Sequence, residues 1–230
     1  MDRPVTEITG ISIQVSLSGY SFKLLSGGGV VQTSPWQSAE RVFTTPEFQR
    51  RYDSVEVSLL TPKVTLVPES FLDPAQARTA LAEVVKLRDN DFVETVAVPS
   101  LGATLVYSNS LDESLSKVVA QTVLPTSGTP VRVLPEMYCL LRELDGISEY
   151  NKIVAAWHGD HLHLVIAQGR SLCLANVFEA PDFTTAQYFL FLTLKRLQLN
   201  PEVSTVHFRS PLLPEDEMSL YRYFKAVVQL

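Results

Sequence analysis

The sequence predicts an α/β protein built from two related, strand-rich halves that meet near residues 145–150. Alternating apolar and polar residues form three short strand patterns at the start of the chain, and the same arrangement returns after residue 150. Each set precedes a helical pattern, a strand and a second helical pattern. Hydrophobic residues make up 46% of the chain and charged residues 19%, which is enough apolar material for a core. We expect a first half over 1–148 with extra elements, and a compact second half over 149–230.

The first half should begin with a meander, because Ile11, Ile13 and Val15 alternate with polar residues and glycines follow at turn positions. Asp73 and Pro74 have the spacing of a helix start, with an acidic N-cap and proline in the first turn. The expected strands are 8–16, 20–25, 30–33, 54–60, 63–67, 92–98, 103–107 and 131–134, and the expected helices are 45–51, 73–89, 111–122 and 136–144.

The second half repeats this order in fewer residues. Gly159 and Gly169 mark the turns of its meander, and Asn200 with Pro201 ends its long helix. The expected strands are 152–157, 161–167, 171–178 and 203–208, and the expected helices are 182–197 and 215–224, followed by a short apolar tail. The duplication rests on element order, since no repeat is visible in the residues themselves.

Composition excludes several classes of protein. A net charge of −6 disfavours sequence-independent binding of nucleic acid, which needs a concentrated basic surface. No apolar run reaches the length of about 20 residues that a membrane-spanning helix needs, and the N-terminus lacks the apolar core of a signal peptide. Cys139 and Cys173 lie among apolar neighbours, so we expect two buried free thiols and a cytoplasmic protein.

A three-strand meander followed by helix, strand and helix resembles the ribonuclease-H-like fold, and two copies resemble the actin-like ATPase superfamily. Residues 153–208 are the clearest match, and they look like the second half of the cell-division and pilus-assembly members. The whole chain also resembles a family of uncharacterised bacterial proteins with a degenerate actin-like fold. The resemblance implies a nucleotide cleft between the halves, with a glycine turn from the first hairpin of each half.

The motif of active members is missing from both turns. The resemblance implies an Asp-x-Gly signature, in which the Asp helps to hold the metal and the glycine turn admits phosphate. The corresponding residues here are Leu17-Ser18-Gly19 and Trp157-His158-Gly159, and no Asp-x-Gly occurs anywhere in the chain. The remaining candidates for a nucleotide contact are Ser18, Gly19, Tyr20, Gly159 and Asp160. Without these carboxylates we do not expect ATP hydrolysis.

Other chemistry has less support. His158, Asp160, His161 and His163 form the most unusual cluster and could hold a transition metal, with His207 on a strand that could lie nearby. The order of these residues is not that of a known metallohydrolase motif, and a hairpin turn with a polar, exposed face explains them better. The glycines at 27–29 lack the lysine of a P-loop and indicate a turn. The first strands lack the clustered carboxylates of a nuclease.

The leading hypothesis is therefore a non-catalytic binding or assembly module that acts on an unknown protein partner, with no cofactor expected. The first alternative is a nucleotide-binding protein that uses Gly19 and Gly159 in the cleft. The second is a metal-dependent enzyme at the histidine cluster. The sequence does not determine the oligomeric state.

Overall fold

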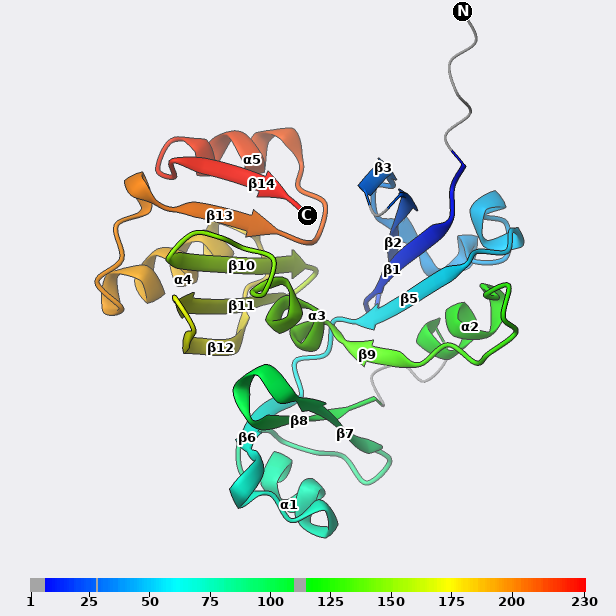
Figure 1. Cartoon of the computed structure of the whole chain (residues 1–230), viewed down its shortest axis with the longest axis horizontal. Helices are drawn as coiled ribbons and strands as arrows, with labels where there is room; N and C mark the ends of the chain where they lie inside the picture. Colours follow the sequence, from blue (N-terminus) through cyan, green and yellow to red (C-terminus); the bar gives the residue numbers. More distant parts are fainter. Residues whose placement is uncertain (1–6, 28, 110–114) are drawn as a thin grey trace, which may run out of the picture. The chain divides into compact units, whose positions relative to one another are not determined.

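The computed structural model of the protein describes residues 7–27, 29–109 and 115–230 (Figure 1). The chain forms two compact units. Unit 1 contains Met1–Leu59 and Asp112–Leu134, and unit 2 contains Leu60–Leu111 and Pro135–Leu230. Each unit holds one sheet of the duplicated plan, and unit 2 also contains a small inserted sheet. Unit 2 thus includes the helix expected over 136–144, which the sequence pattern assigned to the first half. The division between residues 148 and 149 stays a prediction from the sequence.

The sheet of unit 1 runs in the order β3-β2-β1-β5-β9, with β4 paired to β2. Its strands are β1 (Gly10–Val15), β2 (Gly19–Ser26), β3 (Gly29–Thr33), β4 (Gln37–Ser38), β5 (Ser54–Leu59) and β9 (Val133–Pro135). The meander is antiparallel, and β5 lies parallel to β1. The helical elements are η1 (Ala39–Arg41), η2 (Pro46–Gln49) and α2 (Leu115–Thr122). The first four residues of the expected helix 111–122 lie outside the described residues.

The two faces of this sheet differ in chemistry because its strands alternate. One face is apolar, and Ile13, Phe22 and Val57 pack there against Phe48 of η2 and Val119 of α2. The opposite face carries polar side chains, namely Ser12, Gln14, Ser21, Lys23, Glu56 and Ser58, and Ser12 Oγ donates to Glu56 Oε1 at 3.2 Å.

The main sheet of unit 2 has the matching order β12-β11-β10-β13-β14. Its strands are β10 (Asn151–His158), β11 (His161–Gln168), β12 (Ser171–Glu179), β13 (Thr205–Phe208) and β14 (Ala226–Gln229), and its helical elements are α4 (Phe183–Arg196), η6 (Pro201–Val203) and α5 (Pro214–Tyr221). The sequence did not predict β14, which was expected to be an apolar tail. It lies parallel to β13 and is the fifth strand of the sheet.

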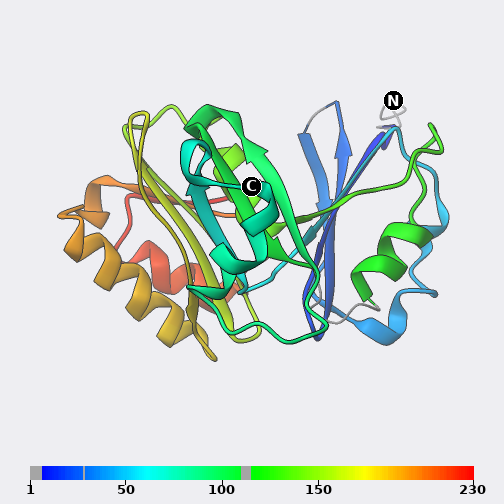
Figure 2. The same ribbon diagram turned by 90° about the horizontal axis from the view of Figure 1, so that it is seen from below.

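Two layers cover the main sheet of unit 2. On one face, Ile153, Leu164 and Val206 pack against Leu190 of α4 and Leu220 of α5. On the other face, Val154 and Val165 pack against the helix α3 (Glu136–Glu143) and the inserted sheet, through Leu140 and Leu105. Figure 2 shows α4 along one face and the inserted strands over the other.

The inserted sheet runs in the order β6-β8-β7 and consists of β6 (Val64–Pro68), β7 (Val93–Val98) and β8 (Ala103–Ser108). It carries α1 (Ala77–Ala82) and the 3₁₀ helices η3 (Glu69–Phe71), η4 (Pro74–Gln76) and η5 (Pro99–Leu101). The helix expected over 73–89 is therefore shorter than predicted. The chain after α1 forms a loop instead of continuing the helix, and side chains bond to its backbone. Asp91 Oδ2 accepts from Arg88 N–H at 2.7 Å, and Arg78 Nη2 donates to the Arg88 carbonyl at 2.8 Å.

Candidate functional site

The turn between β1 and β2 carries the first group of predicted nucleotide contacts and belongs to unit 1. Ser16 N–H donates to the Gly19 carbonyl at 2.8 Å and closes the turn. Leu17 and Ser18 are exposed at its tip, and the hydroxyls of Ser16 and Ser18 lie 3.3 Å apart. The turn therefore presents hydroxyl and backbone groups, and no carboxylate precedes Gly19.

Gly19 is required by a neighbouring strand. β4 pairs with β2 at this point, with Ser38 opposite Gly19 and Gln37 opposite Tyr20. A Cβ at position 19 would overlap the carbonyl oxygen of Gln37. The glycine thus allows two backbones to approach, which explains its presence without a phosphate.

Tyr20 points into the core of unit 1. Its side chain is fully buried, its ring centroid lies 5.0 Å from that of Phe48, and its hydroxyl contacts Thr45 Oγ1. The ring belongs to the face of the sheet that η2 covers. Tyr20 therefore has a structural role that accounts for its size.

The second turn, between β10 and β11 of unit 2, contains Gly159 and Asp160. His158 pairs with His161, so the turn has two residues, and Gly159 has a left-handed φ of +63° with open space where a Cβ would stand. Backbone conformation explains this glycine. Asp160 is exposed, and its carbonyl accepts from Ala180 N–H at 2.6 Å.

Trp157, immediately before this turn, is anchored within unit 2. Its Nε1 donates to the Ala180 carbonyl at 2.9 Å, and its backbone N–H donates to Ser210 Oγ at 2.9 Å. Its ring meets Phe183 of α4 edge-on, with centroids 5.3 Å apart. Trp157 thus joins the second turn to the helical layer.

The histidines share one face of the main sheet in unit 2, but they are spread along it. His158 lies opposite His161, His163 lies opposite Ala156, and His207 lies opposite Val154, four residues before His158. Among residues 7–27, 29–109 and 115–230, no group of three or more His, Cys, Asp or Glu is placed to hold a metal ion. The metal hypothesis therefore rests on sequence spacing alone.

His163 is the most unusual of the four. It is completely buried, and neither ring nitrogen has a hydrogen-bond partner in the part of the chain that the structure describes. Burial, with a smaller contribution from His161, lowers the pKa of His163 to about 3. Burial also lowers the pKa of His158 to about 4. Both rings are therefore neutral at physiological pH.

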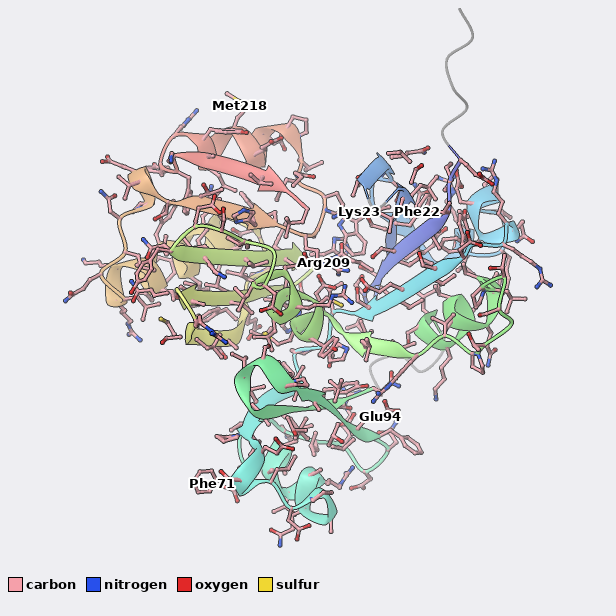
Figure 3. The ribbon with its side chains drawn as sticks, viewed as in Figure 1. Phe22, Lys23, Phe71, Glu94, Arg209 and Met218 are labelled. Carbon is pink, nitrogen blue, oxygen red and sulfur yellow. The ribbon has the colours of Figure 1, made fainter. Side chains whose placement is uncertain are left out.

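A buried ion pair lies near the carboxyl end of β13. Arg209 Nη1 donates to Glu136 Oε2 at 2.8 Å, and Arg209 Nε lies 3.5 Å from Glu143 Oε1 (Figure 3 labels Arg209). The Arg209 backbone N–H donates to the Ala155 carbonyl at 2.8 Å, which extends the pairing of β13 with β10. This pair joins the main sheet to the start of α3, a structural role that sequence reasoning did not identify.

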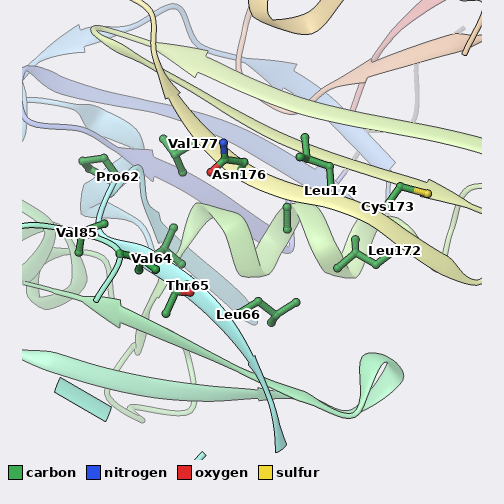
Figure 4. Close-up of a pocket in the computed structure, with 12 residues that line it drawn as sticks. Pro62, Val64, Thr65, Leu66, Val85, Leu172, Cys173, Leu174, Asn176 and Val177 are labelled. Atoms are coloured by element: carbon green, nitrogen blue, oxygen red, sulfur yellow. The ribbon is translucent and has the colours of Figure 1, made fainter. Parts of the chain in front are cut away.

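A groove of about 410 Å³ opens between β6 and β12, and sequence reasoning missed it (Figure 4). Its walls are residues 64–66 of β6, residues 172–177 of β12, and Val84 with Val85 after α1. Cys173 lies in this wall and is a half-buried free thiol, whereas Cys139 is a fully buried one. The expectation of two buried thiols is therefore correct for Cys139 and wrong for Cys173. Local sequence gave no signal, because the two walls are far apart in the chain.

Residues 11–227 match the DUF3822 family, whose description is a protein of unknown function. The chain belongs to the DUF3822 family. No curated protein matches it.

Solved structures resemble this DUF3822 protein along its whole length. One is a protein of unknown function with an actin-like ATPase fold from Bacteroides thetaiotaomicron, with 16% identity and a TM-score of 0.69, covering 100% of this chain and 93% of that one. Another is the PilM-PilN type IV pilus biogenesis complex, with 11% identity and a TM-score of 0.54, covering 97% and 88%. The DUF3822 chain therefore has the actin-like ATPase fold with two ribonuclease-H-like halves, as the sequence predicted.

In the part of the DUF3822 chain that the structure describes, no helix is long and apolar enough to cross a membrane.

Proposed function

We propose that this protein is a non-catalytic binding or assembly module that keeps the actin-like fold without its ATPase chemistry. The observation that carries the proposal is that backbone structure alone explains the glycine in each turn. Gly19 admits β4, and the neighbouring Tyr20 and Trp157 are anchored in the cores of their units. No carboxylate stands before either glycine. Phosphoryl transfer needs Mg²⁺, which takes oxygen ligands, so these turns lack the groups for that reaction.

The proposed partner is another protein. The PilM-PilN complex is an assembly of two proteins, and its likeness to this chain in fold supports a binding role. The net charge of −6 argues against nucleic acid as the partner. The cytoplasmic location expected from the free thiols is part of the same proposal.

A thermal-shift screen of the intact protein against ATP, ADP, GTP and GDP, each with and without Mg²⁺, tests this function. A ligand at about 100 times its Kd stabilises a protein by about 2.7 kcal/mol, which raises the Tm of a chain of this size by roughly 5–10 °C. We expect no nucleotide to move the melting curve. A Mg²⁺-dependent rise with one nucleotide would overturn the proposal in favour of the nucleotide-binding alternative.

The metal-dependent alternative is tested in the same plate with Zn²⁺, Mn²⁺ and Ni²⁺. If His161 binds no metal ion, as the proposed function requires, each ion should change the Tm of the wild type and of His161→Gln by the same amount. A rise in Tm that only the wild type shows would support a site at the histidine cluster.

A further inference from the structure

The groove of unit 2 is formed by strand edges. Side chains of successive residues in a strand point to opposite faces, so a cavity on one face contacts every second residue. Here six consecutive residues of β12, 172–177, line the groove, and so do three consecutive residues of β6, 64–66. The groove therefore runs along the edges, where backbone N–H and C=O groups point outward.

Hydrogen bonding identifies the outward groups. Ala180 N–H donates to the Asp160 carbonyl between β12 and β11, and bonded pairs alternate along antiparallel strands. The backbone groups of Ala175 and Val177 consequently point away from β11. Between β6 and β8, Ser108 N–H donates to the Lys63 carbonyl. By the same alternation, the backbone groups of Leu66 point away from β8. Within the described residues no backbone hydrogen bond joins β6 to β12, which belong to separate sheets.

The edge of β12 is the more accessible template. β6 has five residues, begins two residues after Pro62 and ends in Pro68, and proline protects an edge because it lacks an N–H. β12 has nine residues, contains no proline, and has no charged side chain before Glu179. Most edge strands of natural proteins are protected by charge or proline, so β12 is an exception, and its edge lines the groove opposite β6.

The charges around the groove specify what it would bind. None of its lining residues is charged, and Val84 remains 61% exposed in its wall. Leu172 of the groove also lines a smaller pocket of about 80 Å³, whose other lining residues include Arg170, Lys152 and Asp145. The excess of one positive charge there matches an acidic group at one end of an otherwise uncharged segment.

We propose that this groove binds an extended, uncharged segment of a partner protein, which adds to the edge of β12 as a further strand and places an acidic residue at Arg170. Main-chain hydrogen bonds to Ala175 and Val177 would supply affinity, and the apolar walls would select side chains. The proposal rests on the proposed function because it gives the binding module its partner class.

The probe is a phage-displayed library of linear peptides of about 12 residues, long enough to span β12 with overhang, panned on the intact protein. Selected peptides are synthesised and their Kd is measured by fluorescence anisotropy. We expect uncharged sequences with an acidic residue at one end. Ala175→Pro should weaken binding about tenfold or more, since it removes one outward N–H. Ala175→Ser keeps the N–H and should bind as the wild type does.

Two further measurements separate strand addition from other modes. N-methylation of alternate residues of the peptide should abolish binding in one register and leave it unchanged in the other, because only every second residue bonds to β12. Arg170→Glu, at an exposed turn, should weaken binding several-fold, while Arg170→Lys should not. Bound peptide should also slow alkylation of Cys173.

A library without enriched peptides would overturn the proposal. So would peptides that bind Ala175→Pro and the wild type equally, or that tolerate N-methylation in both registers. Nucleotide binding would overturn the proposed function and leave these results untouched, so the two failures are distinguishable.

Discussion

Gly19 lies against the backbone of Gln37, where β4 pairs with β2, so that even a methyl group at position 19 would overlap the Gln37 carbonyl oxygen. Gly159, its counterpart in the second half, has open space around it and a left-handed φ of +63°. The two glycines therefore occupy equivalent turns for different physical reasons.

This difference predicts unequal costs of substitution. Gly19→Ala should lower the free energy of unfolding by more than about 2 kcal/mol, because two backbones must separate. Gly159→Ala should cost about 1 kcal/mol, the penalty of a left-handed alanine. Urea unfolding measures both. Equal losses would show that Gly19 is not held against β4.

The ion pair between Arg209 and Glu136 should behave as a buried pair, since the side chains are 7% and 0% exposed. Arg209→Met leaves the Glu136 carboxylate buried beside a neutral side chain, so we expect a loss of about 3 kcal/mol or more. The double variant Arg209→Met with Glu136→Leu should lose less than the sum of the two single variants. Chemical denaturation of the wild type and the three variants measures this coupling. Losses in the free energy of unfolding that add exactly in the double variant would contradict a buried pair.

Stability should fall in acid because of His163. The folded pKa is about 3 and the unfolded pKa about 6.5, so only the unfolded chain gains this proton between those values. Stability contributed by the neutral ring is complete above pH 6.5 and decreases as the pH falls toward 3. From pH 6.5 to 5.5 the loss should be about 1 kcal/mol. Urea unfolding at several pH values should show a shallower slope for His163→Leu than for the wild type.

His161→Gln serves as the control for that experiment. His161 is only half-buried; burial lowers its pKa, while the carboxylates of Asp160 and Glu179 act in the opposite direction. The net effect is a lowered pKa, so the slope in His161→Gln should decrease by less than the slope in His163→Leu does. A slope that disappears in both variants would assign the effect to the turn instead of to His163.

The two thiols should differ in reactivity. Cys173 is half-buried in the groove wall and Cys139 is fully buried in the core. Brief treatment of the native protein with iodoacetamide should modify Cys173 and leave Cys139 intact, because the reagent must reach the sulfur. Peptide mass mapping gives the extent at each position. Labelling of Cys139 at the rate of Cys173 would contradict the described packing of α3.

The sequence predicted the two meanders and the long helix α4 because these elements carry their signals locally. Ile11, Ile13 and Val15 alternate with polar residues, and Asp182 caps α4 by accepting from Thr185 N–H at 2.7 Å. β14 was missed because it is short and forms only beside β13, after α5 has returned the chain to that edge.

Long-range contacts explain what the sequence did not reveal about the candidate sites. The role of Gly19 depends on Gln37, and the ion pair joins Glu136 to a residue far along the chain. The groove is made by backbone edges of β6 and β12, and an edge has no residue signature. The missing carboxylates, in contrast, were visible from the sequence at both turns.

We propose that this protein works without nucleotide, and a calorimetric titration of Mg²⁺ and ATP into the intact protein tests that proposal. We expect only heats of dilution up to millimolar nucleotide, for the wild type and for Gly159→Ala alike. A saturable heat with a stoichiometry near one, weakened by Gly159→Ala, would contradict it and assign the turn to a nucleotide site.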